Sequence, residues 1–253
     1  MPLSIAQWHQ RYQQQAQWTR ELRSYIYDRV SITRAKKVLD VGCGTGVLEI
    51  ELTQLCSAET FGLDIDPHPI GFAHQVAPGS IYTIGDALRL PYQSASFDFT
   101  LCHFLFLWVS DALEVMNELS RVTSPGGYVL ALAEPDYGGR IDYPPELTKL
   151  GCWQCEALQD QGAHPFIGRE LRQLFSLAGL VEIEAGVLGA QWHEQDDFNE
   201  LDLEWQVIRS DLDQKPAFTQ QIDRLYAIDK TSRQSQHRIL FVPTFYAFGK
   251  LKG

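Results

Sequence analysis

The nine residues Val38–Gly46, with the sequence VLDVGCGTG, constrain the fold of this chain more than any other stretch. An apolar strand carries an acidic residue at its end, glycine follows at every second position, and apolar residues at helical spacing continue to Leu55. Glycine permits a tight turn in which a ligand lies against bare backbone at a helix N-terminus. The sequence therefore predicts a strand–turn–helix ligand site in an open α/β sheet.

Asp40, just before the glycines, indicates the charge of that ligand. The spacing GxGxG differs from the GxGxxG of dinucleotide enzymes, in which a pyrophosphate lies on the helix end. A carboxylate at Asp40 would repel a phosphate and suits a cation, such as an amino-acid ammonium or a sulfonium. The alternative is that Asp40 only caps the following helix.

Further motifs follow in order along the chain. A second apolar strand, Phe61–Asp64, ends on an acid placed to accept hydrogen bonds from two ribose hydroxyls, although Asp64 also fits an ordinary turn. The segments that come next are Gly85-Asp86-Ala87, Leu90-Pro91, Ser96–Phe99 and Pro125–Leu132.

These motifs, at this spacing, resemble the class I S-adenosylmethionine-dependent methyltransferases of the small-molecule, type 11-like kind. The resemblance covers residues 36–133 strongly and continues more weakly through residues 171–187 and the last strand. It implies a Rossmann-like, seven-stranded, mostly parallel sheet with helices on both faces. It also implies S-adenosyl-L-methionine as cofactor and a small molecule as methyl acceptor.

The resemblance assigns cofactor contacts residue by residue. It places Asp40 and the backbone at the glycine turn near the methionine part of the cofactor, Asp64 at the ribose and Ile65 on the adenine face. Asp86 would accept from the adenine amino group, or instead cap a turn. Arg23 would pair with the cofactor carboxylate, or lie on a solvated helix face. The predicted cofactor set is Arg23, Asp40, Gly42, Cys43, Gly44, Asp64, Ile65, Asp86, Ala87 and Cys102.

Hydrophobic periodicity and breaker residues predict the organisation of the chain. We expect a helical lid over residues 1–34 and a methyltransferase domain over residues 35–253. The expected strands lie near residues 36–41, 59–64, 81–84, 97–102 and 127–133, and helices follow residues 46, 68 and 110. Residues 134–145 read as a loop within a lid insertion that runs to 168, and residues 190–235 read as a helical insertion. Residues 239–248 predict a final strand, antiparallel beside the sixth and disturbed at Pro243.

Candidate residues for chemistry and acceptor binding lie after the fourth and fifth strands. His103 is a possible general base, but we favour a backbone that merely lines the cofactor pocket. No Asn or Asp followed by Pro-Pro-Tyr occurs there, which argues against methylation of adenine or glutamine amino groups. Exposed loop residues at this sheet edge often bind ligands, so Asp136, Tyr137, Arg140 and Tyr143 are the predicted acceptor contacts, with turn chemistry as the alternative.

Charge and cysteine content exclude several classes of function. The formal net charge is −11, with 32 acidic and 21 basic residues and no basic run, which disfavours nucleic acid and anionic membranes as partners. With no long apolar stretch or signal-peptide core, we expect a cytoplasmic protein. The 5 cysteines include one CxxC, Cys152 and Cys155, in a helical context without zinc-ligand spacing, so no metal is predicted. The sequence does not indicate an oligomeric state.

The leading hypothesis is in-line transfer of a methyl group from the sulfonium to a small molecule. One alternative is a protein that binds the cofactor without transferase activity, since its motif would look identical. A nicotinamide-dependent oxidoreductase is a further alternative, but the GxGxG spacing just after Asp40 argues against it. The last is methylation of a thiophilic metalloid, which would require Cys102, Cys152 and Cys155 to converge.

Overall fold

The structure, a computed structural model, describes residues 3–189, 198–212 and 215–253. Its centre is a seven-stranded sheet in the order β3-β2-β1-β4-β5-β9-β7. All neighbours are parallel except β9, which is antiparallel to both β5 and β7. The seven-stranded, mostly parallel sheet predicted from the sequence is therefore confirmed. The strands are β1 (Lys37–Val41), β2 (Glu59–Asp64), β3 (Ile81–Ile84), β4 (Phe97–Cys102), β5 (Thr123–Pro135), β6 (Ile141–Tyr143), β7 (Val181–Leu188), β8 (Ile239–Phe241) and β9 (Thr244–Lys250).

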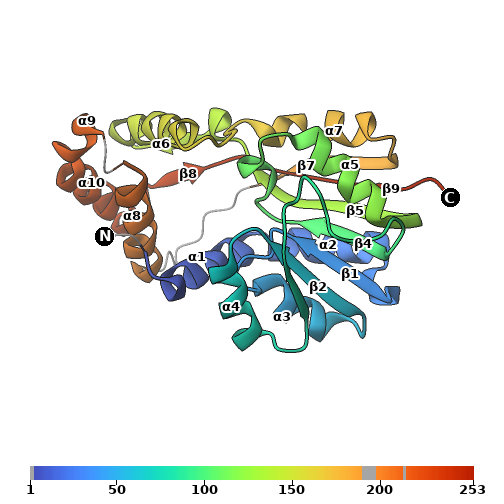
Figure 1. The fold of residues 1–253 in the computed structure, drawn as a ribbon. Coiled ribbons are helices and arrows are strands. Elements are labelled where there is room, and N and C mark those ends of the chain that lie inside the picture. The colour runs from blue at the N-terminus through green and yellow to red at the C-terminus, as the bar shows by residue number, and fades with distance from the viewer. Residues whose placement is uncertain (1–2, 190–197, 213–214) are drawn as a thin grey trace.

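Helices cover both faces of this sheet (Figure 1). Side chains of α2 and α3 share one buried cluster with β1 and β4, whereas α5 and α7 pack into a second cluster on the opposite face. Burial of these apolar faces is the main stabilising contribution to such a layered fold. The helices are α1 (Ile5–Trp18), α2 (Arg20–Val30), α3 (Val47–Leu55), α4 (Pro67–Val76), α5 (Ala112–Val122), α6 (Thr148–Asp160), α7 (Leu171–Leu177), α8 (Phe198–Leu212), α9 (Pro216–Thr219) and α10 (Ile222–Gln234).

A third hydrophobic core holds a helical group beside the sheet. Helices α6, α8, α9 and α10 gather around the fully buried Trp205, and β8 leads from this group back to the sheet (Figure 1). β8 pairs with β6 as a separate two-stranded sheet. The group therefore combines the two segments that the sequence analysis treated as separate insertions. None of the described helices combines the length and apolarity needed to span a bilayer.

Two element predictions were wrong in detail. Residues 1–34 were expected as one helix, but the chain divides at Thr19 into α1 and α2, because the Thr19 hydroxyl bonds back to the carbonyls of Gln15 and Ala16. Residues 134–145 were expected as a loop, yet β5 extends to Pro135 and β6 forms within the segment. β6 exists because β8, far away in sequence, supplies its hydrogen-bonding partner.

The predicted final strand is two strands. Its ladder is interrupted at Val242 and Pro243, and this separates β8 from β9. Pro243 has no N–H to donate, and its carbonyl accepts instead from the N–H of Asp136 at 2.7 Å. The predicted disturbance at Pro243 is confirmed, and so is the antiparallel insertion of the last strand, beside β5 and β7.

Candidate active site

The glycine turn lies between β1 and α3 at the carboxyl edge of the sheet. Gly42, Gly44 and Gly46 all have positive φ angles, of 80°, 53° and 80°. The N–H groups of Gly42 and Cys43 both donate to the carbonyl of Leu63, which ties the turn to the end of β2. A Cβ at Gly44 would lie 3.2 Å from the ring of Tyr12. Backbone conformation and close packing thus both require glycine here.

Asp64 faces this turn from the end of β2. Its Oδ2 accepts from the N–H of Gly44 at 2.9 Å, and its Oδ1 accepts from the N–H of Asp66 at 3.0 Å. Both oxygens are thereby fixed in orientation beside the glycine turn. Ile65, the next residue, is 67% exposed beyond the sheet edge, where an apolar face is open to a ligand.

Asp40 is a strongly perturbed acid of the site. It is 2% exposed, and its Oδ1 has no hydrogen-bond partner among the described residues. Burial and then the nearby Asp64 raise the pKa of Asp40 to about 8, with Arg23 opposing the rise. Beneath it, the fully buried Glu49 has two unpartnered oxygens, and burial raises its pKa well above the usual range. Such a site attracts a cation, which would stabilise the ionised form.

The remaining predicted cofactor residues lie around the same edge. Asp86 is exposed, and its Oδ1 accepts from the N–H of Leu88 at 2.9 Å in a local turn. Ala87 is buried beside it. Cys43 and Cys102 are also buried, and burial raises the pKa of both thiols well above the usual range. These cysteines are therefore neutral packing residues rather than nucleophiles.

Helix α1 lies across the glycine turn. Besides Tyr12 against Gly44, the Nδ1 of His9 lies 2.8 Å from the hydroxyl of Thr45, and its ring packs at a tilt against the ring of Phe72 of α4. Sequence reasoning missed Tyr12 and His9, because their spacing on an ordinary amphipathic helix carries no signal of what the helix covers.

Arg23 lies buried behind the turn instead of facing open space. Its Nε and Nη2 donate to the two carboxylate oxygens of Glu51 at 2.9 and 2.5 Å, and Nη1 donates to Thr19 and the carbonyl of Ala16. In this structure Arg23 therefore fixes α2 onto α3 through a bidentate ion pair. Its burial contradicts the solvated face, and its pairing with the cofactor carboxylate stays a prediction.

His103 lies directly after β4, against the junction of α1 and α2. Its Nε2 is 2.8 Å from the hydroxyl of Thr19. Burial, and secondarily Arg23, lower the pKa of His103 to about 3. The imidazole is consequently neutral and a weak base at neutral pH.

Glu134, near the end of β5, organises the loop after His103. It is fully buried and accepts from the N–H groups of Leu105, Phe106 and Leu107 at 2.8, 3.0 and 3.3 Å. Burial nevertheless raises the pKa of Glu134 to about 7. The sequence analysis placed Glu134 in a loop and gave it no role. The signal that could have identified it is its position as an acid directly after an apolar run.

The four predicted acceptor contacts differ in their surroundings. Asp136 is 2% exposed and forms a bidentate ion pair with Arg169, so its carboxylate is not free for a ligand. Tyr143 lies in β6 and is 52% exposed. Tyr137 and Arg140 both line a large cavity.

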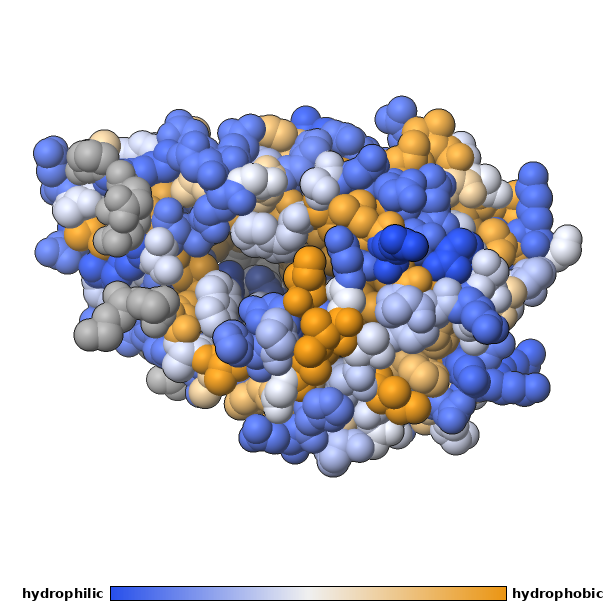
Figure 2. All heavy atoms as spheres, in the orientation of Figure 1, coloured by the Kyte–Doolittle hydropathy of each residue, from blue (hydrophilic) through white to orange (hydrophobic). Residues whose placement is uncertain are grey.

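This cavity, of about 900 Å³, lies between α1, α2, α8, α10 and the carboxyl end of β5. Figure 2 shows the corresponding hollow in this face of the molecule, with hydrophilic side chains in its depth. Phe104 and Pro135 connect it to the ends of β4 and β5, at the sheet edge where the glycine turn follows β1. Its other apolar lining residues are Trp18, Tyr137, Leu188, Val207, Ile208, Leu240, Phe241 and Val242.

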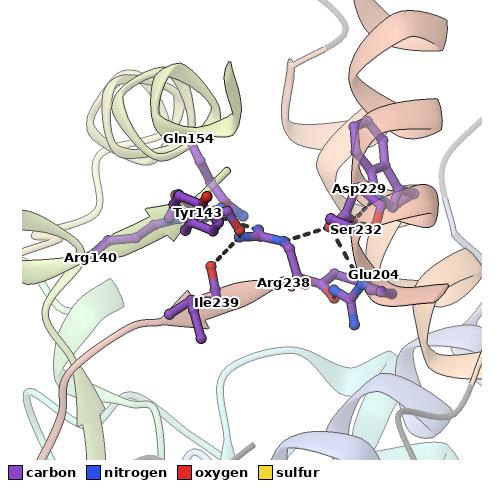
Figure 3. A network of polar contacts seen from close by, with 11 residues as sticks. Arg140, Tyr143, Gln154, Glu204, Asp229, Ser232, Arg238 and Ile239 are labelled. Carbon is purple, nitrogen blue, oxygen red and sulfur yellow. Dashed lines mark hydrogen bonds and ion pairs between the residues drawn. The ribbon is translucent and has the colours of Figure 1, made fainter. Parts of the chain in front are cut away.

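A buried polar network forms one wall of the cavity (Figure 3). Arg238 donates to Asp229 at 2.5 Å, to Asp142 at 2.7 Å and to the carbonyls of Tyr143 and Ile239. Asp142 also accepts from Arg140, which donates in addition to Gln154 at 2.6 Å. The network joins β6, α6, α8 and α10, so it holds the wall in one geometry.

Comparisons with known proteins agree with this geometry. The family model of the methyltransferase domain matches residues 39–131. Demethylmenaquinone methyltransferase of Geobacillus stearothermophilus is 31% identical over 182 residues, which cover 64% of this chain and 78% of the relative. Malonyl-[acyl-carrier protein] O-methyltransferase of Erwinia billingiae is 36% identical over 110 residues, 44% of this chain and 42% of the relative. Phosphoethanolamine N-methyltransferase 2 of Haemonchus contortus, solved with S-adenosyl-L-methionine, superposes with a TM-score of 0.55 at 16% identity, over 86% of this chain and 49% of that one.

The fold, the glycine turn and these relatives define a methyltransferase that takes its methyl group from S-adenosylmethionine. The chain belongs to the class I S-adenosylmethionine-dependent methyltransferases. Within the described residues, no three His, Cys, Asp or Glu side chains gather as a metal site requires. The metalloid hypothesis finds no support, because Cys102 is buried in β4 while Cys152 is exposed on α6.

Proposed function

We propose that this methyltransferase transfers the methyl group to a small organic molecule bound in the cavity between α1, α8 and the sheet. The observation that carries the proposal is the position of that cavity. It reaches Phe104, just after β4, the neighbour of β1, and Pro135 at the end of the next strand, β5, so an acceptor there lies at the same edge of the sheet as the glycine turn. A protein that only binds the cofactor needs no second cavity of this size.

The cofactor roles follow from the arrangement of the acids. We assign the sulfonium and ammonium end to the glycine turn beside Asp40, the ribose to Asp64 and the adenine to Ile65, Asp86 and Ala87. In this assignment residues 1–34 act as the lid over a domain formed by residues 35–253, since Tyr12 and His9 already contact the turn.

Alignment supplies most of the rate in this proposal. The methyl group on a sulfonium is already electrophilic, so holding the acceptor atom in line with the carbon–sulfur bond and excluding water accelerate transfer. His103 has a lowered pKa, of about 3, and takes no proton here. The acceptor atom must therefore be nucleophilic without a base from this residue.

The relatives leave the acceptor open. Their names give demethylmenaquinone and malonyl-[acyl-carrier protein], two chemically different acceptors, and this chain is only 31% and 36% identical to them over the aligned residues. We propose further that neither nucleic acid nor a membrane surface is a partner, because the chain carries a net charge of −11. The five cysteines are free thiols, as is typical of cytoplasmic proteins, and this supports the expected cytoplasmic location.

A labelling experiment tests the proposal. The protein is incubated with methyl-labelled S-adenosylmethionine and with either a protein-free filtrate of a bacterial extract, the protein fraction or the nucleic acid fraction. We expect transfer of label into small molecules of the filtrate, and none with an Asp64→Ala variant. Label found in protein or nucleic acid, and absent from the filtrate, would contradict a small-molecule acceptor.

A further inference from the structure

The cavity assigned to the acceptor is lined by two chemically distinct kinds of residue. Its lining combines apolar residues from β5, β8 and α8 with five arginines, Arg11, Arg20, Arg140, Arg233 and Arg238. Two acids, Glu21 and Glu204, complete the charged lining. The cavity lining thus has more basic than acidic residues, although the whole chain is strongly acidic.

The arginines of the wall network are neutralised by the protein itself. Arg140 and Arg238 share Asp142, and Arg238 also pairs with Asp229 (Figure 3). Arg233 pairs with Glu204 at 2.8 Å. A buried ion pair of this kind has its charge compensated and its donors occupied, so it shapes the cavity without demanding an anion.

Arg11, on α1, differs from these arginines. It is 9% exposed, its Nη1 donates to Gln14 at 2.6 Å, and its guanidinium lies 4.7 Å from the centre of the Trp18 ring. Across the described ranges no carboxylate forms an ion pair with it. Burial raises the pKa of the nearby Asp211 and the charge of Arg11 opposes that rise, but the Asp211 carboxylate accepts a hydrogen bond from Gln154 and not from Arg11.

A buried guanidinium without a carboxylate is costly unless an anion joins it. Every other buried arginine of the described chain, namely Arg23, Arg140 (by its side chain) and Arg238, has such a partner. Arg20, exposed at the cavity lining, adds a second cation outside any ion pair within the described part.

We propose that the methyl acceptor is an organic carboxylate with an apolar body, and that Arg11 binds its carboxylate. This inference rests on the proposed function and names the chemical class of its acceptor. The planar guanidinium offers paired N–H donors that match a carboxylate, while Phe104, Leu240 and Phe241 contact the apolar body. Tyr12, the next residue on α1, contacts the glycine turn, so one helix contacts both the cofactor site and the acceptor.

The test compares two probes of the same shape, of which one is charged and the other is not. The protein, saturated with S-adenosylhomocysteine, is titrated calorimetrically with 3-phenylpropionate and with 3-phenylpropionamide, and phenyl phosphate serves as a different anion. We expect the carboxylate to bind roughly tenfold or more tightly than the amide, as a charge-assisted pair would give. Arg11→Gln should remove that preference, and Arg11→Lys should retain part of it.

Arg29→Gln is the matched control, because it removes one positive charge from neighbouring α2 at a surface pair with Glu184. It should leave the preference unchanged. The proposal is overturned if 3-phenylpropionate fails to bind, if the amide or only phenyl phosphate binds as well or better, or if Arg11→Gln keeps the preference. The affinity for S-adenosylhomocysteine, measured first in each variant, separates these outcomes from a failure of the cofactor site itself.

Discussion

At the scale of single residues, the fold strongly changes the acidity of the Asp40 carboxyl. Its pKa of about 8 means that the carboxyl is protonated at neutral pH in the free protein. A bound sulfonium or ammonium stabilises the carboxylate and so lowers this pKa. Binding of S-adenosylmethionine should therefore release a proton and strengthen as the pH rises from about 6 to about 8.

Calorimetric titrations in two buffers of different ionisation enthalpy measure that proton release. Asp40→Asn should abolish it. The Asp40 carboxyl also affects the stability of the protein. Its pKa is higher in the folded than in the unfolded state, so between these two pKa values the folded protein holds a proton that the unfolded chain has lost. The free energy of unfolding therefore falls as the pH rises between the two pKa values. Proton uptake on binding, or none in the native protein, would contradict the assignment of Asp40.

Asp64 is the second residue at which a substitution is decisive. Asp64→Ala removes the two carboxylate oxygens assigned to the ribose, and with them the hydrogen bond to the N–H of Gly44. Since hydrogen bonds to a charged acceptor contribute about 1.5–3 kcal/mol each and two to the ribose are lost, affinity for S-adenosylmethionine should fall roughly 10²- to 10⁴-fold. Titration calorimetry checks this, and near-native affinity in the variant would exclude the ribose role.

At the scale of elements, Glu134 links β5 to the loop after β4. Glu134→Ala leaves three buried N–H groups, those of Leu105, Phe106 and Leu107, without an acceptor. We expect the free energy of unfolding to fall by roughly 2–5 kcal/mol, measured by urea denaturation. Glu114→Ala, at an exposed position in the first turn of α5, is the control and should change it little. Equal stability of both variants would show that the loop does not depend on Glu134.

Elements also show how far sequence reasoning reaches. Local patterns predicted β1 to β4 within one or two residues, and β1, β2 and β3 are apolar runs closed by Gly or Asp. They failed where a distant partner decides the structure. β6 forms because β8 pairs with it. Helix α1 ends next to Thr19, whose hydroxyl donates to carbonyls of the preceding turn, and α2 then packs onto the sheet.

The same limit applies to the candidate site. Asp40, Asp64 and the glycine turn lie together as predicted, since they end adjacent parallel strands. The surroundings of Arg23, Arg11 and Glu134 depend on side chains from other parts of the chain, such as Glu51 for Arg23, and no local pattern encodes these contacts.

At the scale of the whole molecule, Arg238 joins the helical group to the sheet side of the cavity. It contacts Asp229 of α10 and Asp142 of β6, and Asp229 in turn accepts from the indole N–H of Trp205 at 2.7 Å. Arg238→Ala leaves two buried carboxylates without this partner. The free energy of unfolding should drop by about 3–5 kcal/mol, as for other broken buried pairs.

Urea unfolding followed by tryptophan fluorescence measures that loss. Lys37→Ala is the matched control, since it breaks an exposed pair with Glu59 at 3.6 Å and should cost less than about 1 kcal/mol. Comparable effects of the two substitutions would contradict the structural role of Arg238.

The central claim is that the glycine turn, Asp40 and Asp64 form a site for S-adenosylmethionine. The most direct test is calorimetric titration of the purified protein with S-adenosylmethionine, S-adenosylhomocysteine and NAD. We predict micromolar binding of the first two ligands and no binding of NAD. Binding of NAD alone would contradict the claim and direct the search toward redox chemistry.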